Sequence, residues 1–212
     1  MTSTPPLLLA STSPSRRSIL TSTGFAFGTQ APEVDERAEV EALRAAGELV
    51  SPGQEAQLLG TAKSRAVAAT PEAAGRVVLG CDSVFELDGV AYGKPHLPEV
   101  ALERWRGMSG RTGVLHTGHH LVDVSTGREA SRLVSTAVTF AEVSEDEIRA
   151  YVASGEPLEC AGAFTVDGLA AAFVTRLEGD FHAVVGLSPA ALRSMASELG
   201  IPLAALWAAP AA

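Results

Sequence analysis

The sequence is poor in several features that each define a class of protein. It has only two cysteines in 212 residues, Cys81 and Cys160, and neither belongs to a Cys-x-x-Cys pair. This excludes a disulfide scaffold and a multi-cysteine zinc site, and it predicts free thiols in a reducing compartment. Positive charge is also scarce, with 16 Lys and Arg against 25 Asp and Glu. Without a strongly basic face, the chain is not expected to bind nucleic acid.

Long hydrophobic runs are missing as well. No stretch is long enough to span a bilayer, and no charged start followed by an apolar run resembles a secretion signal. We therefore expect a cytoplasmic protein with no membrane partner. The hydrophobic content of 46% is nevertheless enough to bury a core without disulfides. The length suits a single domain over residues 1–212, or two closely fused lobes.

Short apolar runs alternate with helical patterns, which predicts an α/β fold. Leu7 to Ala10 and Arg76 to Val84 are apolar runs typical of buried strands. Asp88-Gly89 indicates a hairpin turn between two short strands. The remaining strands are predicted over residues 85–87, 90–92, 114–124, 131–143 and 169–177.

Helix starts are marked by caps. Gln54 and Glu147 each stand three residues after a serine, as a capping box requires. Three Ser-Pro pairs each place an N-cap serine before a proline in the first turn, namely Ser13-Pro14, Ser51-Pro52 and Ser188-Pro189. Another helix is predicted over residues 98–108. The chain before Leu7 and after Trp207 is expected to form loose ends.

The segment from Ser11 to Arg17 could bind an anion. It lies between the first predicted strand and the first predicted helix, where backbone N–H groups and the helix dipole favour negative charge. Its serines can donate to phosphate oxygens, and an arginine can bind them in a bidentate manner. The alternative is a serine-rich helix cap with solvated arginines. It is not a P-loop, because Gly-x-x-x-x-Gly-Lys-Ser/Thr does not occur.

Asp82 lies near the end of the predicted strand 76–84, which places it at the rim of a cleft. Its carboxylate could hold a metal ion or accept a proton from water; the alternative is an aspartate that caps a turn. Asp35-Glu36 could share a divalent ion with Asp82, or form part of a charged surface loop. Lys94 and Arg111, each next to a glycine turn, suit a phosphate but could equally be solvated.

Three histidines, His116, His119 and His120, lie in the predicted strand 114–124. Alternation places His116 and His120 on one face and His119 on the other. Neither a helical His-x-x-x-His pair nor a nearby Glu-x-x-His accompanies them, so we do not expect a zinc site.

These motifs, in their order along nearly the whole chain, resemble those of the Maf-like family. The matching segments are residues 9–17, 35–36, 62–63, 80–84, 93–95, 109–111, 151–157, 161–164 and 184–187. The resemblance implies an elongated α/β fold similar to that of the inosine triphosphate pyrophosphatases, with a mixed, twisted sheet and two lobes around a cleft. It also implies hydrolysis of a nucleoside triphosphate to the monophosphate and pyrophosphate, with Mg²⁺ or Mn²⁺.

The resemblance also implies roles for individual residues. Asp82 matches the proton-accepting aspartate of the family, and Glu36 with Asp82 would hold the metal ion. The positions that match the family's substrate site are Ser11, Ser13, Arg16, Glu36, Lys63 and Lys94. Arg111, in the matching segment 109–111, is also expected to bind substrate. A homodimer and a role in septum formation or division arrest are further expectations from the family.

Three positions that discriminate between branches of the family match neither branch. One branch prefers dTTP and UTP and the other 7-methyl-GTP, and this chain has Ser15, Ser83 and Asp167 at the discriminating places. The preferred base therefore stays open. Ser188 also stands where the family usually has proline. Two other functions remain open beside the pyrophosphatase: a nucleotide-binding regulator of division, and a phosphohydrolase that releases orthophosphate.

Overall fold

The computed structural model describes residues 6–45 and 49–208 and confirms the predicted α/β fold. The predicted loose ends lie mostly outside this range, in residues 1–5 and 209–212. A single mixed sheet has the strand order β2-β1-β3-β5-β6-β7, and β4 pairs with β3 beside this path. Within the described residues, no helix combines the length and the hydrophobicity that crossing a lipid bilayer requires.

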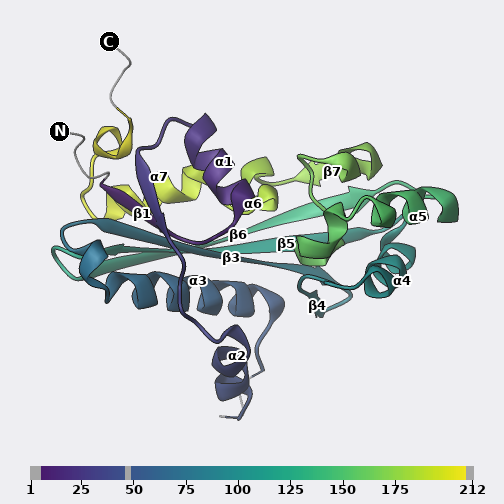
Figure 1. Ribbon diagram of the computed structural model, residues 1–212, viewed down its shortest axis with the longest axis horizontal. Helices are drawn as coiled ribbons and strands as arrows, with labels where there is room; N and C mark the ends of the chain where they lie inside the picture. The colour runs from purple at the N-terminus through teal and green to yellow at the C-terminus, as the bar shows by residue number, and fades with distance from the viewer. Residues whose placement is uncertain (1–5, 46–48, 209–212) are drawn as a thin grey trace.

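Three long antiparallel strands, β3 (Val77–Leu87), β5 (Thr112–Asp123) and β6 (Arg128–Phe140), run along the molecule (Figure 1). β3 and β5 are paired without interruption from Val77↔Asp123 to Glu86↔Val114. The predicted strands 76–84 and 85–87 are thus one strand. The expectation that Asp82 lies near a strand end is wrong, because β3 continues into the hairpin and places Asp82 in its middle.

The outer edge of β3 has two short partners with a gap between them. β1 (Leu7–Ala10) runs parallel to β3 and ends where Ala10 faces Gly80, and β2 (Phe27–Gln30) lies beyond β1. β4 (Val90–Tyr92) returns antiparallel after the predicted hairpin turn, and Tyr92 faces Phe85. Residues 81–84 of β3 therefore have no strand partner on this edge within the described chain. We call residues 81–84 the edge gap.

Helices cover both faces of the sheet. α3 (Pro52–Ala68) lies against one face with α2 (Glu36–Ala45) beyond it, and the opposite face carries α1 (Pro14–Ser22), α6 (Phe181–Val185) and α7 (Pro189–Glu198) (Figure 1). The predicted serine caps of α1, α3 and α7 and the capping box of α3 are confirmed. α5 (Glu145–Ala153) also begins with its predicted capping box.

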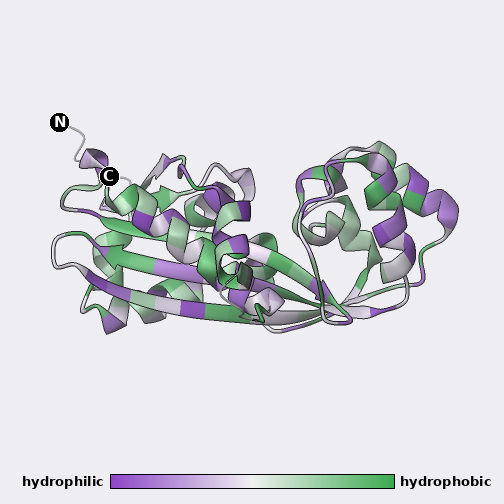
Figure 2. Cartoon of the chain, turned by 90° about the horizontal axis from the view of Figure 1, so that it is seen from below, coloured by the Kyte–Doolittle hydropathy of each residue, from purple (hydrophilic) through white to green (hydrophobic). Residues whose placement is uncertain are grey.

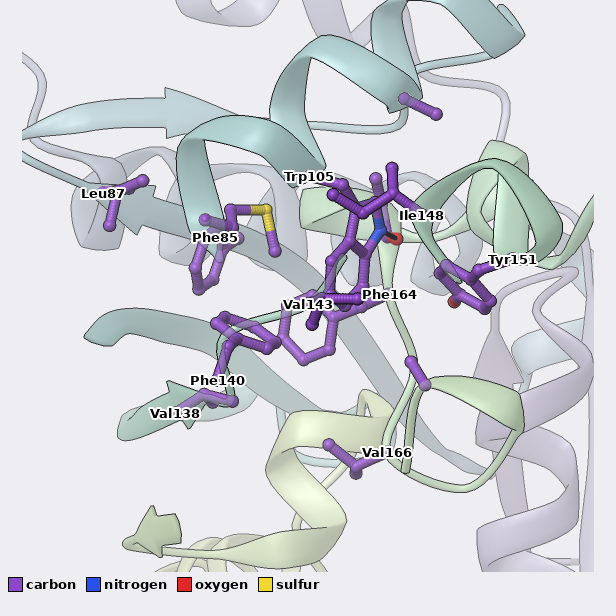
Figure 3. Packing of buried hydrophobic residues seen from close by; sticks show 14 of the residues in the cluster. Phe85, Leu87, Trp105, Val138, Phe140, Val143, Ile148, Tyr151, Phe164 and Val166 are labelled. Carbon is purple, nitrogen blue, oxygen red and sulfur yellow. Dashed lines mark hydrogen bonds between the residues drawn. The ribbon is translucent and has the colours of Figure 1, made fainter. Parts of the chain in front are cut away.

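A second lobe is built around the far ends of the long strands, as Figure 2 shows. It contains α4 (Pro98–Met108), α5 and β7 (Val174–Glu178). Its core is rich in aromatic side chains, which pack edge to face (Figure 3). Trp105 lies 5.2 Å from Tyr151 and 5.4 Å from Phe140 between ring centroids. Because Phe85 of β3 is in the same cluster, the strand that carries Asp82 also anchors this lobe.

The predicted strand 169–177 is wrong in its first half. Leu169–Phe173 form a 3₁₀ helix, and β7 begins only at Val174. The carboxylate of Glu156 accepts hydrogen bonds from the backbone N–H groups of Leu169 and Ala170, which favours a helical turn there. The sequence analysis also missed β2, α2 and α6. A signal for α2 was present, since Asp35 caps its first turn by accepting from the Ala38 N–H at 3.0 Å.

Glycines let α3 lie directly on the sheet backbone. A Cβ added to Gly80 would lie 2.2 Å from the carbonyl oxygen of Gly60, and one added to Gly118 would lie 2.4 Å from that of Ala56. No side chain fits between these backbones. α3 is therefore held in a fixed register against β3 and β5.

We expect Gly80→Ala to lower the free energy of unfolding by about 3 kcal/mol, because α3 must move away from the sheet to admit the methyl group. Urea unfolding followed by circular dichroism measures the change. Gly107→Ala is the matched control: the glycine is exposed in α4 with nothing within 4 Å of the added Cβ. This variant should be stabilised by up to about 1 kcal/mol. Equal stability of Gly80→Ala and the native chain would contradict the close contact.

Candidate active site

The centre of the candidate site is a lysine held between two carboxylates. Lys63, on α3, places its Nζ 2.5 Å from an oxygen of Asp82 on β3 and 2.7 Å from an oxygen of Glu36 at the start of α2. The side chains of Lys63 and Asp82 are 9% and 13% exposed, whereas that of Glu36 is 54% exposed. Glu36 also lines a hollow of about 410 Å³ between α2 and α3. The three side chains thus extend from the buried middle of β3 to the solvent-exposed start of α2.

Burial changes the acid–base properties of Asp82. It raises the pKa of the Asp82 carboxyl above its usual value, while the positive charges of Lys63 and Arg16 oppose the shift. A raised pKa makes a carboxylate a better proton acceptor near neutral pH, and the adjacent cations keep the ionised form accessible.

The predicted anion-binding segment lies at the proximal border of the edge gap. Ser11 follows the end of β1, and Ser13 caps α1 by accepting from the Arg16 N–H at 3.4 Å. The Arg16 guanidinium donates to Ser11 Oγ at 3.3 Å, to Ser83 Oγ at 3.2 Å and to the carbonyl oxygen of Gly186 at 2.8 Å. The structure therefore brings Ser11, Ser13 and Arg16 together beside Asp82 and Ser83.

Lys94 lies at the distal border of the same gap. Tyr92, the last residue of β4, faces Phe85 next to the gap, and Lys94 follows two residues later. Lys94 is half exposed there, and its Nζ lies 3.4 Å from Glu159. Such a weak, exposed ion pair leaves the ammonium available to a phosphate.

The other three predicted residues occupy different places in the structure. Arg111 pairs with Asp88 at 2.5 Å, and Asp88 follows β3 about 20 Å along the strand from Asp82, at a rise of about 3.3 Å per residue. Asp167 is exposed in the second lobe and accepts a hydrogen bond from Thr165. Ser15 lies in the first turn of α1, next to Arg16.

Glu36 and Asp82 form a donor set that fits a small divalent cation. An oxygen of each lies within 2.7 Å of the Lys63 ammonium, so both carboxylates are within reach of one positive charge. In the described part of the chain, no three His, Cys, Asp or Glu side chains form a group that could hold a metal ion alone. Two carboxylates completed by phosphate oxygens and water are the arrangement that Mg²⁺ accepts.

Comparison with known proteins agrees with this geometry. The family model for Maf-like proteins matches residues 6–199, which include every residue of the candidate site. The chain belongs to the Maf-like family.

Curated relatives of this Maf-like chain share one name. A protein of Streptomyces coelicolor is 47% identical over 202 residues, covering 95% of this chain and 94% of its own. A protein of Leifsonia xyli is 47% identical over 206 residues, covering 95% and 96%. One of Nocardia farcinica is 45% identical over 216 residues, covering all of both chains. Each is named nucleoside triphosphate pyrophosphatase.

The sequence analysis missed one buried polar residue behind the site. Thr117 faces Ser83 across the β3–β5 ladder, with 2.9 Å between the hydroxyl oxygens, and donates to the carbonyl oxygen of Ala183 at 2.7 Å. No motif indicates this residue, because its partner is known only once the pairing of β3 with β5 is known.

The three histidines have structural partners. His116 bonds Glu86 and Ser135, and His120 bonds the hydroxyl of Ser64 on α3 at 2.6 Å. His119 lies on the opposite face of β5, as alternation predicts. These bonds tie β5 to its neighbouring strands and to the helices on both faces.

His119 accepts a hydrogen bond from Ser188, the position where the family resemblance led us to expect proline. The backbone N–H of Ser188 donates to Nε2 of His119 at 2.8 Å, while Nδ1 lies 3.2 Å from the carbonyl oxygen of Arg132. A proline at position 188 has no N–H and could not make this bond. Burial lowers the pKa of His119 to about 4, so the ring is neutral at pH 7 with its proton on Nδ1.

We expect His119 to make stability depend on pH between about 6.5 and 4. Its pKa is lower in the folded chain than in the unfolded chain, so its contribution is complete above pH 6.5 and is lost as pH falls towards 4. The loss should approach ~3 kcal/mol. Urea unfolding at pH 7, 5.5 and 4 should show a flatter profile for His119→Gln. His96→Gln, which alters an exposed histidine, is the control. Parallel profiles for all three proteins would exclude this role.

Proposed function

We propose that this Maf-like chain, acting as one domain, hydrolyses nucleoside triphosphates to the monophosphate and pyrophosphate. The observation that carries the proposal is the Lys63–Asp82 pair at the edge gap, with Arg16 at one border and Lys94 at the other. The name shared by the curated relatives supports the same reaction.

The cations around the gap suit a triphosphate. Arg16 and the N-terminus of α1 would bind phosphate oxygens from one side, with the hydroxyls of Ser11 and Ser13 as further donors. Lys63 and Lys94 would contact them from α3 and the second lobe. Together these groups would stabilise the negative charge that develops on the leaving pyrophosphate. Arg111 is not part of the proposed site, because it pairs with Asp88 at the far end of β3.

Asp82 would orient the attacking water and accept its proton. The raised pKa of its carboxyl favours proton transfer, and Lys63 would stabilise the charge as the proton moves. Glu36 and Asp82 would together hold Mg²⁺ or Mn²⁺. When bound, this ion would neutralise phosphate charge and help to align the water with the scissile bond.

Base preference would depend on Ser15, Ser83 and Asp167, which lie on α1, β3 and the second lobe. We place the enzyme in the cytoplasm and propose that it acts on free nucleotides. The acidic net charge of -9 supports small phosphorylated substrates over a nucleic-acid polymer.

Product analysis tests the reaction. We expect incubation with a panel of nucleoside triphosphates and Mg²⁺ or Mn²⁺ to give monophosphate and pyrophosphate in equal amounts, as measured by anion-exchange chromatography. Chelation with EDTA should abolish turnover, and restored metal should recover it. Release of orthophosphate, or binding without turnover, would instead support a different phosphohydrolase or a nucleotide-binding regulator.

We expect Asp82→Asn to lower kcat by about 10²–10⁴-fold, because the amide cannot accept the proton of the water. The variant keeps the shape of the side chain, and its fold is checked by circular dichroism and thermal unfolding. Glu86→Gln is the matched control. Glu86 is four residues further along the same face of β3, where it bonds His116. Near-native turnover in Asp82→Asn would assign proton transfer to another residue.

A further inference from the structure

Four hydrogen bonds and a short stretch of backbone form a closed ring behind the edge gap. From Arg16 on α1 it leads to Ser83 on β3, Thr117 on β5 and the carbonyl oxygen of Ala183 in α6. The chain from Ala183 continues to Gly186, whose carbonyl oxygen accepts from Nε of Arg16 at 2.8 Å and closes the ring. Four elements that are distant in sequence are thus connected through one guanidinium.

The conformation at Gly186 belongs to the ring. Its φ of 129° is one that L side chains rarely adopt, so glycine allows the turn that points its carbonyl at Arg16. This gives a physical reason for the glycine in the motif of residues 184–187.

The direction of each hydrogen bond in the ring is fixed. The hydroxyl hydrogen of Thr117 is directed at the carbonyl oxygen of Ala183, which can only accept. In the bond between Ser83 and Thr117, the donor must therefore be Ser83. Ser83 then has no hydrogen left and can only accept from Arg16. The direction Arg16 → Ser83 → Thr117 → Ala183 follows from the single proton on each hydroxyl.

This direction suits a guanidinium that must be held in one orientation. Arg16 can only donate, and Ser83 can only accept from it because the Ser83 hydroxyl already donates to Thr117. Three of the five N–H groups of Arg16 have acceptors among the described residues. One hydrogen on each terminal nitrogen remains to bind phosphate oxygens.

We propose that Thr117 is a positioning residue for phosphate binding, which acts through Ser83 to orient the guanidinium of Arg16. The proposal rests on the proposed function, in which Arg16 binds the triphosphate. Thr117 itself is fully buried and reaches Arg16 only through Ser83. Its hydroxyl holds the arginine in one orientation before the substrate arrives, so binding costs less conformational entropy.

The test is kinetic and calorimetric. We expect Thr117→Val to raise KM about tenfold and to weaken the affinity for pyrophosphate, measured by titration calorimetry, by a similar factor. A loss of folded protein would instead lower kcat and leave KM and the affinity unchanged. Thr117→Ser keeps the hydroxyl and should stay within about twofold of the native chain.

Thr136→Val is the matched control. Thr136 is also fully buried, and its hydroxyl bonds the backbone of Asp180 just before α6. It is not in the ring, so its KM and pyrophosphate affinity should be those of the native chain. An equal change in both valine variants would show a general packing effect and overturn the proposal.

A double-mutant cycle shows whether Thr117 acts through Ser83. In a Ser83→Ala background, Thr117→Val should raise KM less than twofold, because the connection is already broken. Independent, multiplicative effects would overturn the proposal. If the native chain hydrolysed no nucleotide, the proposed function would fail, whereas the calorimetric comparison would still decide the role of Thr117.

Discussion

The direct contact between the backbone of α3 and the sheet is the constraint on which the candidate active site depends. Gly60, Gly80 and Gly118 bring the two backbones so close that no Cβ can lie between them. The height and the register of α3 are thereby fixed, and Lys63 reaches Asp82 with its side chain almost buried. A helix held off the sheet by side chains would leave the ammonium short of the carboxylate. The three glycines thus determine how closely Lys63 approaches Asp82.

The edge gap determines where the remaining charges gather. β1 stops one residue before the gap and is followed by the cap of α1, while β4 stops beyond it and is followed by Lys94. Cations from both borders are thus brought near one short stretch of β3, where Lys63 and Lys94 are paired with carboxylates. A group of cations at one place suits a small, densely charged anion better than an extended one.

Local chemistry could be predicted from the sequence, whereas long-range pairing could not. Ser-Pro caps, capping boxes and the Asp88-Gly89 turn depend on neighbouring residues, and these predictions are confirmed. The strand predicted over residues 169–177 failed because its first turn is capped by Glu156, which is distant in sequence. The family resemblance placed Lys63 and Asp82 in one site, but no local pattern predicted the contact between them. Thr117 needed the strand register, which no motif encodes.

The continuity of the long strands also determines how the two lobes can move. β3, β5 and β6 pass from one lobe into the other, and the β3–β5 ladder is unbroken across the edge gap. Rotation of one lobe about a flexible joint would break these backbone bonds. Any movement of one lobe relative to the other must therefore occur by bending and twisting of the continuous sheet, with a small amplitude. In such a molecule, the capture and release of ligand depend mainly on the side chains and loops at the borders of the gap.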